Sequence, residues 1–223
     1  MKKSLAGLAL GVCLFAAHDA AATTVFATQI DSGRTGAAEL GFTTTPVDNT
    51  NRAAGGNALG APDATFANSG GGFYSLGLGG AAVFGFGVDF GTQATVFEVT
   101  FGCTGPQSPN GTCSFVETAD VYALAGGYTP FDGAFGLSDL LSLGFQKVGS
   151  IPNGVANTAG GATIAISGPF SWLALVDTSP FVNGRDGFDV DAVSVSAVPL
   201  PASILFLLGG LGGLGLLRAR RAA

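Results

Sequence analysis

Short runs of apolar residues, separated by Gly, Pro and Asn, fill the middle of this 223-residue chain. In several runs apolar and polar residues alternate, which is typical of a strand with one buried face. The pattern predicts eight strands, at residues 24–30, 83–90, 96–101, 119–125, 145–151, 162–167, 172–177 and 188–197. Many short strands between turn residues are typical of a sandwich or barrel, so we expect an all-β fold.

Local features refine these strands. Gly91-Thr92 predicts a turn, and residues 137–143 predict one or two helical turns capped by Ser138. In the run 96–101, alternation places Phe97 on the predicted buried face and Glu98 on the solvent face. Residues 31–72 are polar and rich in Gly, Asn and Ala, so we expect a loop there.

The last predicted strand contains a change of parity. Phe188 and Val190 share one parity, whereas Val193 and Val195 share the other. A β-bulge near Asp191-Ala192 would bring all four apolar side chains to a single buried face.

The first residues have the features of a signal peptide. Lys2 and Lys3 precede an uncharged apolar run that extends to residue 17, and Ala20-Ala21-Ala22 follows. A basic start, an apolar stretch and small residues at a cleavage site are typical of such a signal. We expect residues 1–22 to be removed by signal peptidase, and Cys13 with them.

A second apolar run lies near the other end of the chain. It comprises the uncharged residues 204–217, which form a helix of roughly 21 Å at ~1.5 Å per residue, against a hydrocarbon core of ~30 Å. The run is preceded by Val198-Pro199-Leu200-Pro201-Ala202 and followed by Arg218, Arg220 and Arg221. Arginines beside a span resist translocation, so we expect them in the cytoplasm and the rest of the mature chain outside.

This tail, residues 198–223, resembles the PEP-CTERM sorting signal in its VPLPA variant. The resemblance implies a Gram-negative bacterium that makes exopolysaccharide. It also implies a membrane-embedded exosortase that cuts near the proline motif, so the inner-membrane anchor is transient and the product reaches the cell surface or the medium. The alternative is a stable C-terminal anchor that is never cut.

The composition of residues 23–197 excludes several functions. They contain four basic and fourteen acidic residues, a net charge of −10, so nucleic acids and anionic lipids are poor partners. They contain no histidine, which excludes Ser-His-Asp and Cys-His catalysis and histidine-bound zinc. Their two cysteines, Cys103 and Cys113, predict a disulfide in an exported chain.

Two segments of the predicted ectodomain, residues 23–197, carry a second resemblance. Residues 57–63 read Asn-Ala-Leu-Gly-Ala-Pro-Asp and residues 186–193 read Asp-Gly-Phe-Asp-Val-Asp-Ala-Val. They resemble the opening and closing segments of galactose-binding-like or discoidin-like domains of exported bacterial proteins. The resemblance implies a single jelly-roll-like β-sandwich, but it implies no ligand.

The second of these segments is also a candidate calcium site. Carboxylate oxygens suit Ca²⁺, and Asp186, Asp189 and Asp191 lie within six residues. Asp63 would complete the site if the first and last segments are neighbours. The alternative is that these carboxylates cap turns and face water.

Candidate catalytic and sugar-stacking residues are few. A glycosidase needs two facing carboxylates, and the spacing of the glutamates brings no two of them together. Trp172 and the tyrosines, Tyr74, Tyr122 and Tyr128, are able to stack on sugars, although a lone Trp is more often part of a core.

We therefore expect no catalytic residues. We expect an exported surface or matrix protein that is structural or glycan-binding and is associated with exopolysaccharide. The alternatives are a hydrolase that uses Asp and Glu, and a stably anchored adhesin.

Overall fold

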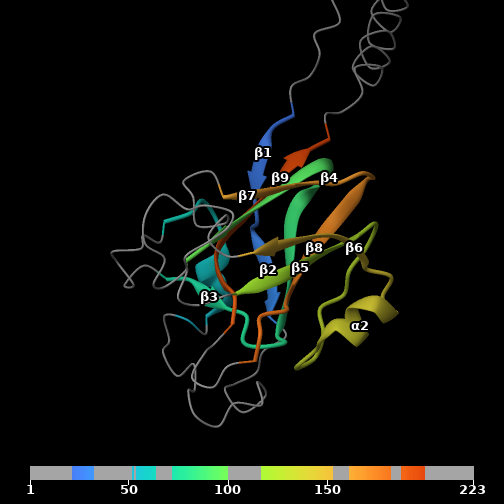
Figure 1. Ribbon diagram of the computed structural model, residues 1–223. Helices are drawn as coiled ribbons and strands as arrows, with labels where there is room; N and C mark the ends of the chain where they lie inside the picture. Colours follow the sequence, from blue (N-terminus) through green and yellow to red (C-terminus); the bar gives the residue numbers. More distant parts are fainter. Residues whose placement is uncertain are drawn as a thin grey trace, which may run out of the picture. The chain divides into compact units, whose positions relative to one another are not determined.

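Strands make up most of the described chain, and they pair into a large antiparallel sheet (Figure 1). The computed structural model describes residues 22–32, 52, 54–63, 72–99, 117–152, 161–181 and 187–198, all within one unit, Ala22–Val198. Its strands are β1 (Thr24–Phe26), β2 (Gln29–Ser32), β3 (Tyr74–Ser75), β4 (Ala81–Glu98), β5 (Thr118–Leu124), β6 (Gln146–Pro152), β7 (Ala162–Ala165), β8 (Phe170–Asp177) and β9 (Asp189–Ala197). Two short helices, η2 (Gly55–Ala58) and α2 (Leu137–Ser142), accompany them. The predicted β-rich fold is confirmed, whereas both predicted terminal segments lie almost wholly outside the described residues.

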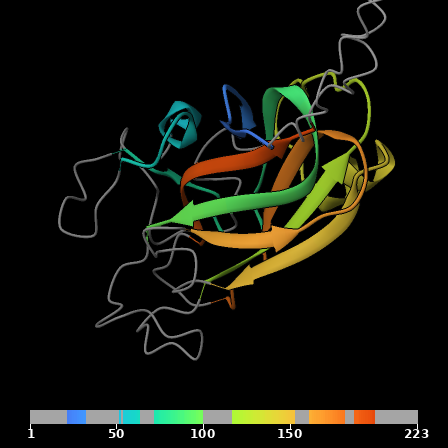
Figure 2. The ribbon, with the colours of Figure 1, turned by 90° about the horizontal axis from the view of Figure 1, so that it is seen from above.

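β4 is the strand around which the others are arranged. Its first part pairs with β2 and β8, and its last part pairs with β7 and β9. Between Gly85 and Phe90 the register with β8 shifts, and Gly87 adopts a φ of 70°. Figure 2 shows β4 curving from one group of strands to the other. A bend at Gly87 thus lets one strand belong to two groups.

The predicted turn at Gly91-Thr92 is wrong, because β4 continues through both residues. Gly91 has a different reason to be glycine. A Cβ there would lie 1.9 Å from the carbonyl oxygen of Gly168, so the residue permits close approach of two backbones.

The remaining order of the sheet is β1-β9-β4-β8-β5-β6, with β3 paired to β9. The predicted strand 24–30 is in fact two strands. β1 pairs with β9 and β2 pairs with β4, because the chain changes partner at Ala27-Thr28. The N–H of Ala27 donates to the oxygen of Val193, and the N–H of Thr28 donates to that of Gly85.

The main apolar core uses one side of both parts of β4. Phe84, Phe90 and Val96 belong to it, together with Leu173 of β8 and Val193 of β9. The alternate residues of the first part of β4, with Ala174 and Val176, form a second cluster that packs against Leu140 of α2 and Phe145. The first part of β4 and the part of β8 that pairs with it are therefore covered on both faces.

The predicted bulge in the last strand is confirmed. Phe97 pairs with Ala192 and Glu98 pairs with Val190, so Asp191 is an additional residue on β9. As a result Val190, Val193 and Val195 all join the main core despite their different parity.

Two local predictions are wrong. Val96 is buried, Phe97 is half-buried and Glu98 is only 2% exposed. The residues of this part of β4 that face the core are therefore the even-numbered ones and not, as predicted, the odd-numbered ones. At α2 the N-cap is Gly136, and its N–H donates to Oδ2 of Asp139 at 2.9 Å. The side chain of Asp139, three residues into the helix, thus replaces the cap that was predicted at Ser138.

Candidate binding site at the bend of β4

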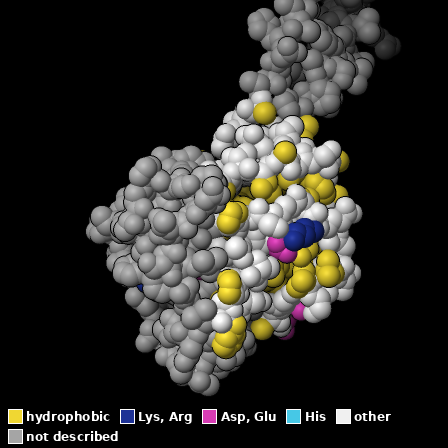
Figure 3. All heavy atoms as spheres, viewed as in Figure 1, with side chains coloured by type: hydrophobic (Ala, Val, Ile, Leu, Met, Phe, Trp, Pro, Cys, Tyr) yellow, Lys and Arg dark blue, Asp and Glu magenta, His cyan; other side chains and the backbone are white. Residues whose placement is uncertain are grey.

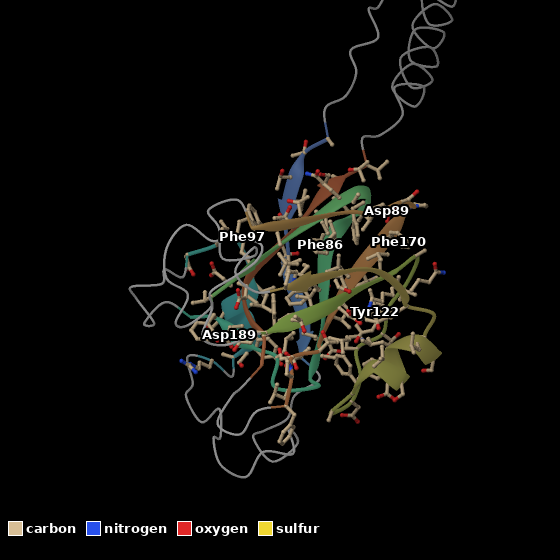
Figure 4. All side chains as sticks on the ribbon, in the orientation of Figure 1. Phe86, Asp89, Phe97, Tyr122, Phe170 and Asp189 are labelled. Carbon is tan, nitrogen blue, oxygen red and sulfur yellow. The ribbon has the colours of Figure 1, made fainter. Side chains whose placement is uncertain are left out.

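A cavity of about 290 Å³ lies where β4 bends. We call it the β4 cavity, and its lining residues come from β2, β4 and β8: Gln29, Gly87, Val88, Asp89, Ser171 and Trp172. Figure 4 shows Asp89 near Phe170 at one end of the sheet and Asp189 at the other. On the inner side of the bend, the rings of Phe86 and Phe90 are 5.2 Å apart, and that of Phe170 is 6.2 Å from Phe90.

The position of Trp172 depends on a glycine in the neighbouring strand. Gly85 pairs with Gln29 on one side and with Trp172 on the other, so the three positions share one face of the sheet. A Cβ at Gly85 would lie 2.4 Å from Cζ3 of Trp172. The missing side chain therefore leaves the space that the indole ring occupies beside Gln29.

An aromatic cluster also packs against this ring. The ring of Tyr128 lies 5.0 Å from that of Trp172, and the rings of Phe131 and Phe145 contact Tyr128 at 6.0 Å. The Tyr128 hydroxyl donates to Oδ2 of Asp31 at 2.5 Å, and the N–H of Phe131 donates to the same oxygen at 2.9 Å. Burial, followed by the bond to Asp31, raises the pKa of Tyr128 well above its usual value, so the phenol keeps its proton.

The polar part of the β4 cavity centres on Asp89. Oδ1 of this exposed carboxylate accepts a hydrogen bond from Oγ of Ser171 at 2.6 Å. Its carbonyl oxygen accepts from the N–H of Val198 at 2.9 Å. A carboxylate, an amide and a hydroxyl beside an indole suit a ligand that has one apolar face and several hydrogen-bonding groups.

Sequence reasoning named Trp172 and Tyr128 as stacking candidates but missed the polar residues Gln29, Asp89 and Ser171. The glycines at 85 and 87, within an otherwise apolar strand, were the available signal, because such glycines often mark a bend or a close approach. The other two candidate tyrosines are core residues, since Tyr74 and Tyr122 are buried.

The candidate calcium residues lie at the opposite end of β9. The N–H of Asp63 donates to Oδ1 of Asp191 at 3.3 Å, which confirms that the first and last segments are neighbours. Asp189 and Asp191 are 6% and 4% exposed, so the alternative that they face water is wrong. Asp186 lies outside the described residues.

No described group of three or more His, Cys, Asp or Glu residues is placed to hold a metal ion. Calcium binding by Asp63, Asp186, Asp189 and Asp191 thus stays a prediction.

Three further buried acids lie toward that same end of the sheet. Glu98 and Glu117 are buried, and Asp177 accepts hydrogen bonds from Gly79, Ser179 and Phe188. These three donors come from separate segments, so Asp177 ties them together. Burial raises the pKa of Asp177, although its hydrogen bonds lower it.

The remaining predicted site residues lie outside the described part of the chain, apart from Val198. They are Cys103, Cys113, Pro199, Leu200, Pro201, Ala202, Arg218, Arg220 and Arg221. None of the described helices is long and apolar enough to cross a membrane.

No family model, curated protein or solved structure matches the chain significantly.

Proposed function

We propose that this is an exported, non-enzymatic protein of the cell surface or extracellular matrix that binds glycans. Residues 1–22 direct its export, and the tail from Val198 is a substrate of an exosortase in a Gram-negative bacterium. The tail anchors the protein in the inner membrane only until it is cut. The ectodomain then binds exopolysaccharide.

The observation that carries this proposal is the position of the domain's two ends. β1 begins at Thr24, just after the expected signal cleavage, and β9 ends at Ala197, just before the proline motif. The N–H of Ala197 donates to the oxygen of Thr23 at 2.9 Å, so the ends are neighbours. The described core residues lie between Ala27 and Val195. Removal of the signal peptide and of the C-terminal tail would therefore take away none of these core residues.

The fold we propose for the ectodomain is a jelly-roll-like sandwich. Its support is the two sets of partners of β4 and the single core to which both parts of β4 contribute. A contact between β6 and β7 also supports it. A Cβ at Gly149 of β6 would lie 3.1 Å from Cδ1 of Ile164 of β7, and since these two strands do not pair, they meet face to face.

Binding is favoured over hydrolysis by the chemistry of the β4 cavity. Asp89 is the one carboxylate among the described residues that line it, whereas glycosidases use two across the scissile bond. The exposed surface also suits a soluble extracellular role. Figure 3 shows hydrophobic side chains in separate groups on the described part of one face, rather than in one continuous patch.

The test of export and sorting is the intact mass of the protein from the culture medium and from membranes. A species that starts near Thr23 and ends near the proline motif is expected in the medium. A Pro199→Ala/Pro201→Ala variant should stay in the membrane with its tail, and Pro180→Ala serves as a control outside the motif. A wild-type protein found only in membranes with an intact tail would replace sorting with stable anchoring.

A further inference from the structure

We propose that the β4 cavity binds one pyranose residue of an uncharged polysaccharide, with the apolar face of the sugar against the part of Trp172 that lines the cavity and its hydroxyls on Asp89 and Gln29. The proposal rests on the glycan-binding part of the function above. It adds the location of the site, the residues that make it and the class of sugar.

The aromatic part of the site fits a pyranose because both surfaces are flat and partly apolar. The Trp172 ring lies against Gly85 and 5.0 Å from the ring of Tyr128, so two contacts hold it while part of it lines the β4 cavity. An indole held in this way offers contact area at little further cost in side-chain entropy. Val88, which is 38% exposed, adds a second apolar contact beside it.

The polar part of the site fits neighbouring hydroxyls, each of which both donates and accepts. Ser171 uses one acceptor position of Asp89, and a carboxylate has about four, so acceptor capacity remains. The Gln29 amide supplies a donor and an acceptor, and it stands across Gly85 from the indole. A sugar against the part of the indole that lines the cavity would thus meet a carboxylate and an amide at its edges.

Charge restricts the sugar to an uncharged one. Asp89 is a carboxylate, and residues 23–197 carry a net charge of −10, so uronic acids and phosphorylated sugars would be repelled. A quaternary ammonium group is the main competing ligand for an aromatic ring beside a carboxylate, but it favours a cage of several rings. Trp172 is the one aromatic residue among the described residues that line the β4 cavity.

The test uses the full chain in a polyoxyethylene detergent, which has neither a sugar nor an ammonium headgroup. Trp172 is the only tryptophan, so intrinsic indole fluorescence reports on this ring alone. Neutral monosaccharides, glucuronic acid and choline are titrated separately, and a retention assay on neutral polysaccharide from the host is run in parallel. We expect a saturable change with at least one neutral sugar and none with glucuronic acid or choline.

Variants with matched controls assign the residues. Asp89→Asn should weaken sugar binding about tenfold, the size expected when a charged hydrogen-bond partner is removed. The exposed residue Asp132 provides the control variant Asp132→Asn, and Gln93→Ala is the control for Gln29→Ala. Trp172→Ala removes the ring, and Trp172→Phe, which keeps an aromatic ring, replaces it if the alanine variant does not fold. Calorimetry measures the affinity of either variant, because neither retains a tryptophan.

The outcomes separate this proposal from the broader one. Retention on polysaccharide that is unchanged in Asp89→Asn and Trp172→Phe would overturn the site but leave glycan binding intact. Choline binding without sugar binding would also overturn it. If the wild-type chain binds neither sugars nor polysaccharide, both the site and glycan binding fail, while export and sorting are judged separately by the mass measurement.

Discussion

At the scale of single residues, Asp177 connects three segments through its carboxylate. The side chain is 3% exposed and accepts N–H groups from Gly79 and Phe188, each at 2.9 Å. Asp177→Ala would leave both N–H groups without this acceptor, so we expect a loss of about 3 kcal/mol in the free energy of unfolding. Urea unfolding measures it, with Asp132→Ala as the exposed control. A loss no greater than the control's would contradict the linking role.

The raised pKa of Asp177 predicts that its contribution to the free energy of unfolding depends on pH. Burial raises its pKa in the folded protein above the ordinary 3.8, so the folded state holds this proton more tightly than the unfolded state does. The resulting stability is complete below 3.8 and is lost as the pH rises through the folded pKa. The difference in unfolding free energy between wild type and Asp177→Ala should therefore be larger at acid pH than at neutral pH. A difference that grows toward neutral pH would show that the hydrogen bonds outweigh burial.

At the scale of elements, the bend of β4 depends on Gly87. A Cβ there would have space around it, but a φ of 70° is unfavourable for any residue with a side chain. We expect Gly87→Ala to lower the free energy of unfolding by about 1–2 kcal/mol. Gly127→Ala is the matched control, because that glycine also has open space but no positive φ. Equal effects in a thermal melt would contradict a requirement for the left-handed conformation.

The segment between β5 and α2 is joined to β2 in part by the hydroxyl of Tyr128. Tyr128→Phe keeps the ring beside Trp172 but removes the bond to Asp31, so we expect a loss of about 1 kcal/mol. In the Asp31→Asn background the same substitution should cost less, because the two residues share one interaction. Chemical unfolding of the four proteins measures this coupling. Strictly additive losses would show that the bond contributes nothing to stability.

Sequence pattern predicted those elements whose signal is local. The bulge at Asp191 could be predicted because the parity of the valines changes within one run. The burial of Glu98 could not, because the phenylalanines around it suggested the other face, and pairing with Val190 decides which face is inside. The polar half of the β4 cavity also escaped prediction, since Gln29 and Trp172 become neighbours only through their common partner Gly85.

At the scale of the whole molecule, residues 23–198 should fold without either end. The described core lies within this range, and β1 and β9 pair at its two limits. We expect a chain shortened to residues 23–198 to unfold within about 2 °C of the full chain, because no described core residue is lost. Calorimetry of both chains measures this. A much lower transition temperature would show that a terminal segment belongs to the folded domain.

The hydrogen bond from Val198 to Asp89 has a mechanical consequence. The chain leaves the domain at residue 198, and the β4 cavity lies beside that exit. A pull between a ligand in the cavity and the chain beyond residue 198 would run through this junction and the adjoining pair of Phe90 and Ala197. The bonds at this junction would be loaded first, and if they opened, the load would pass along β9 to its pairs with β1 and β4.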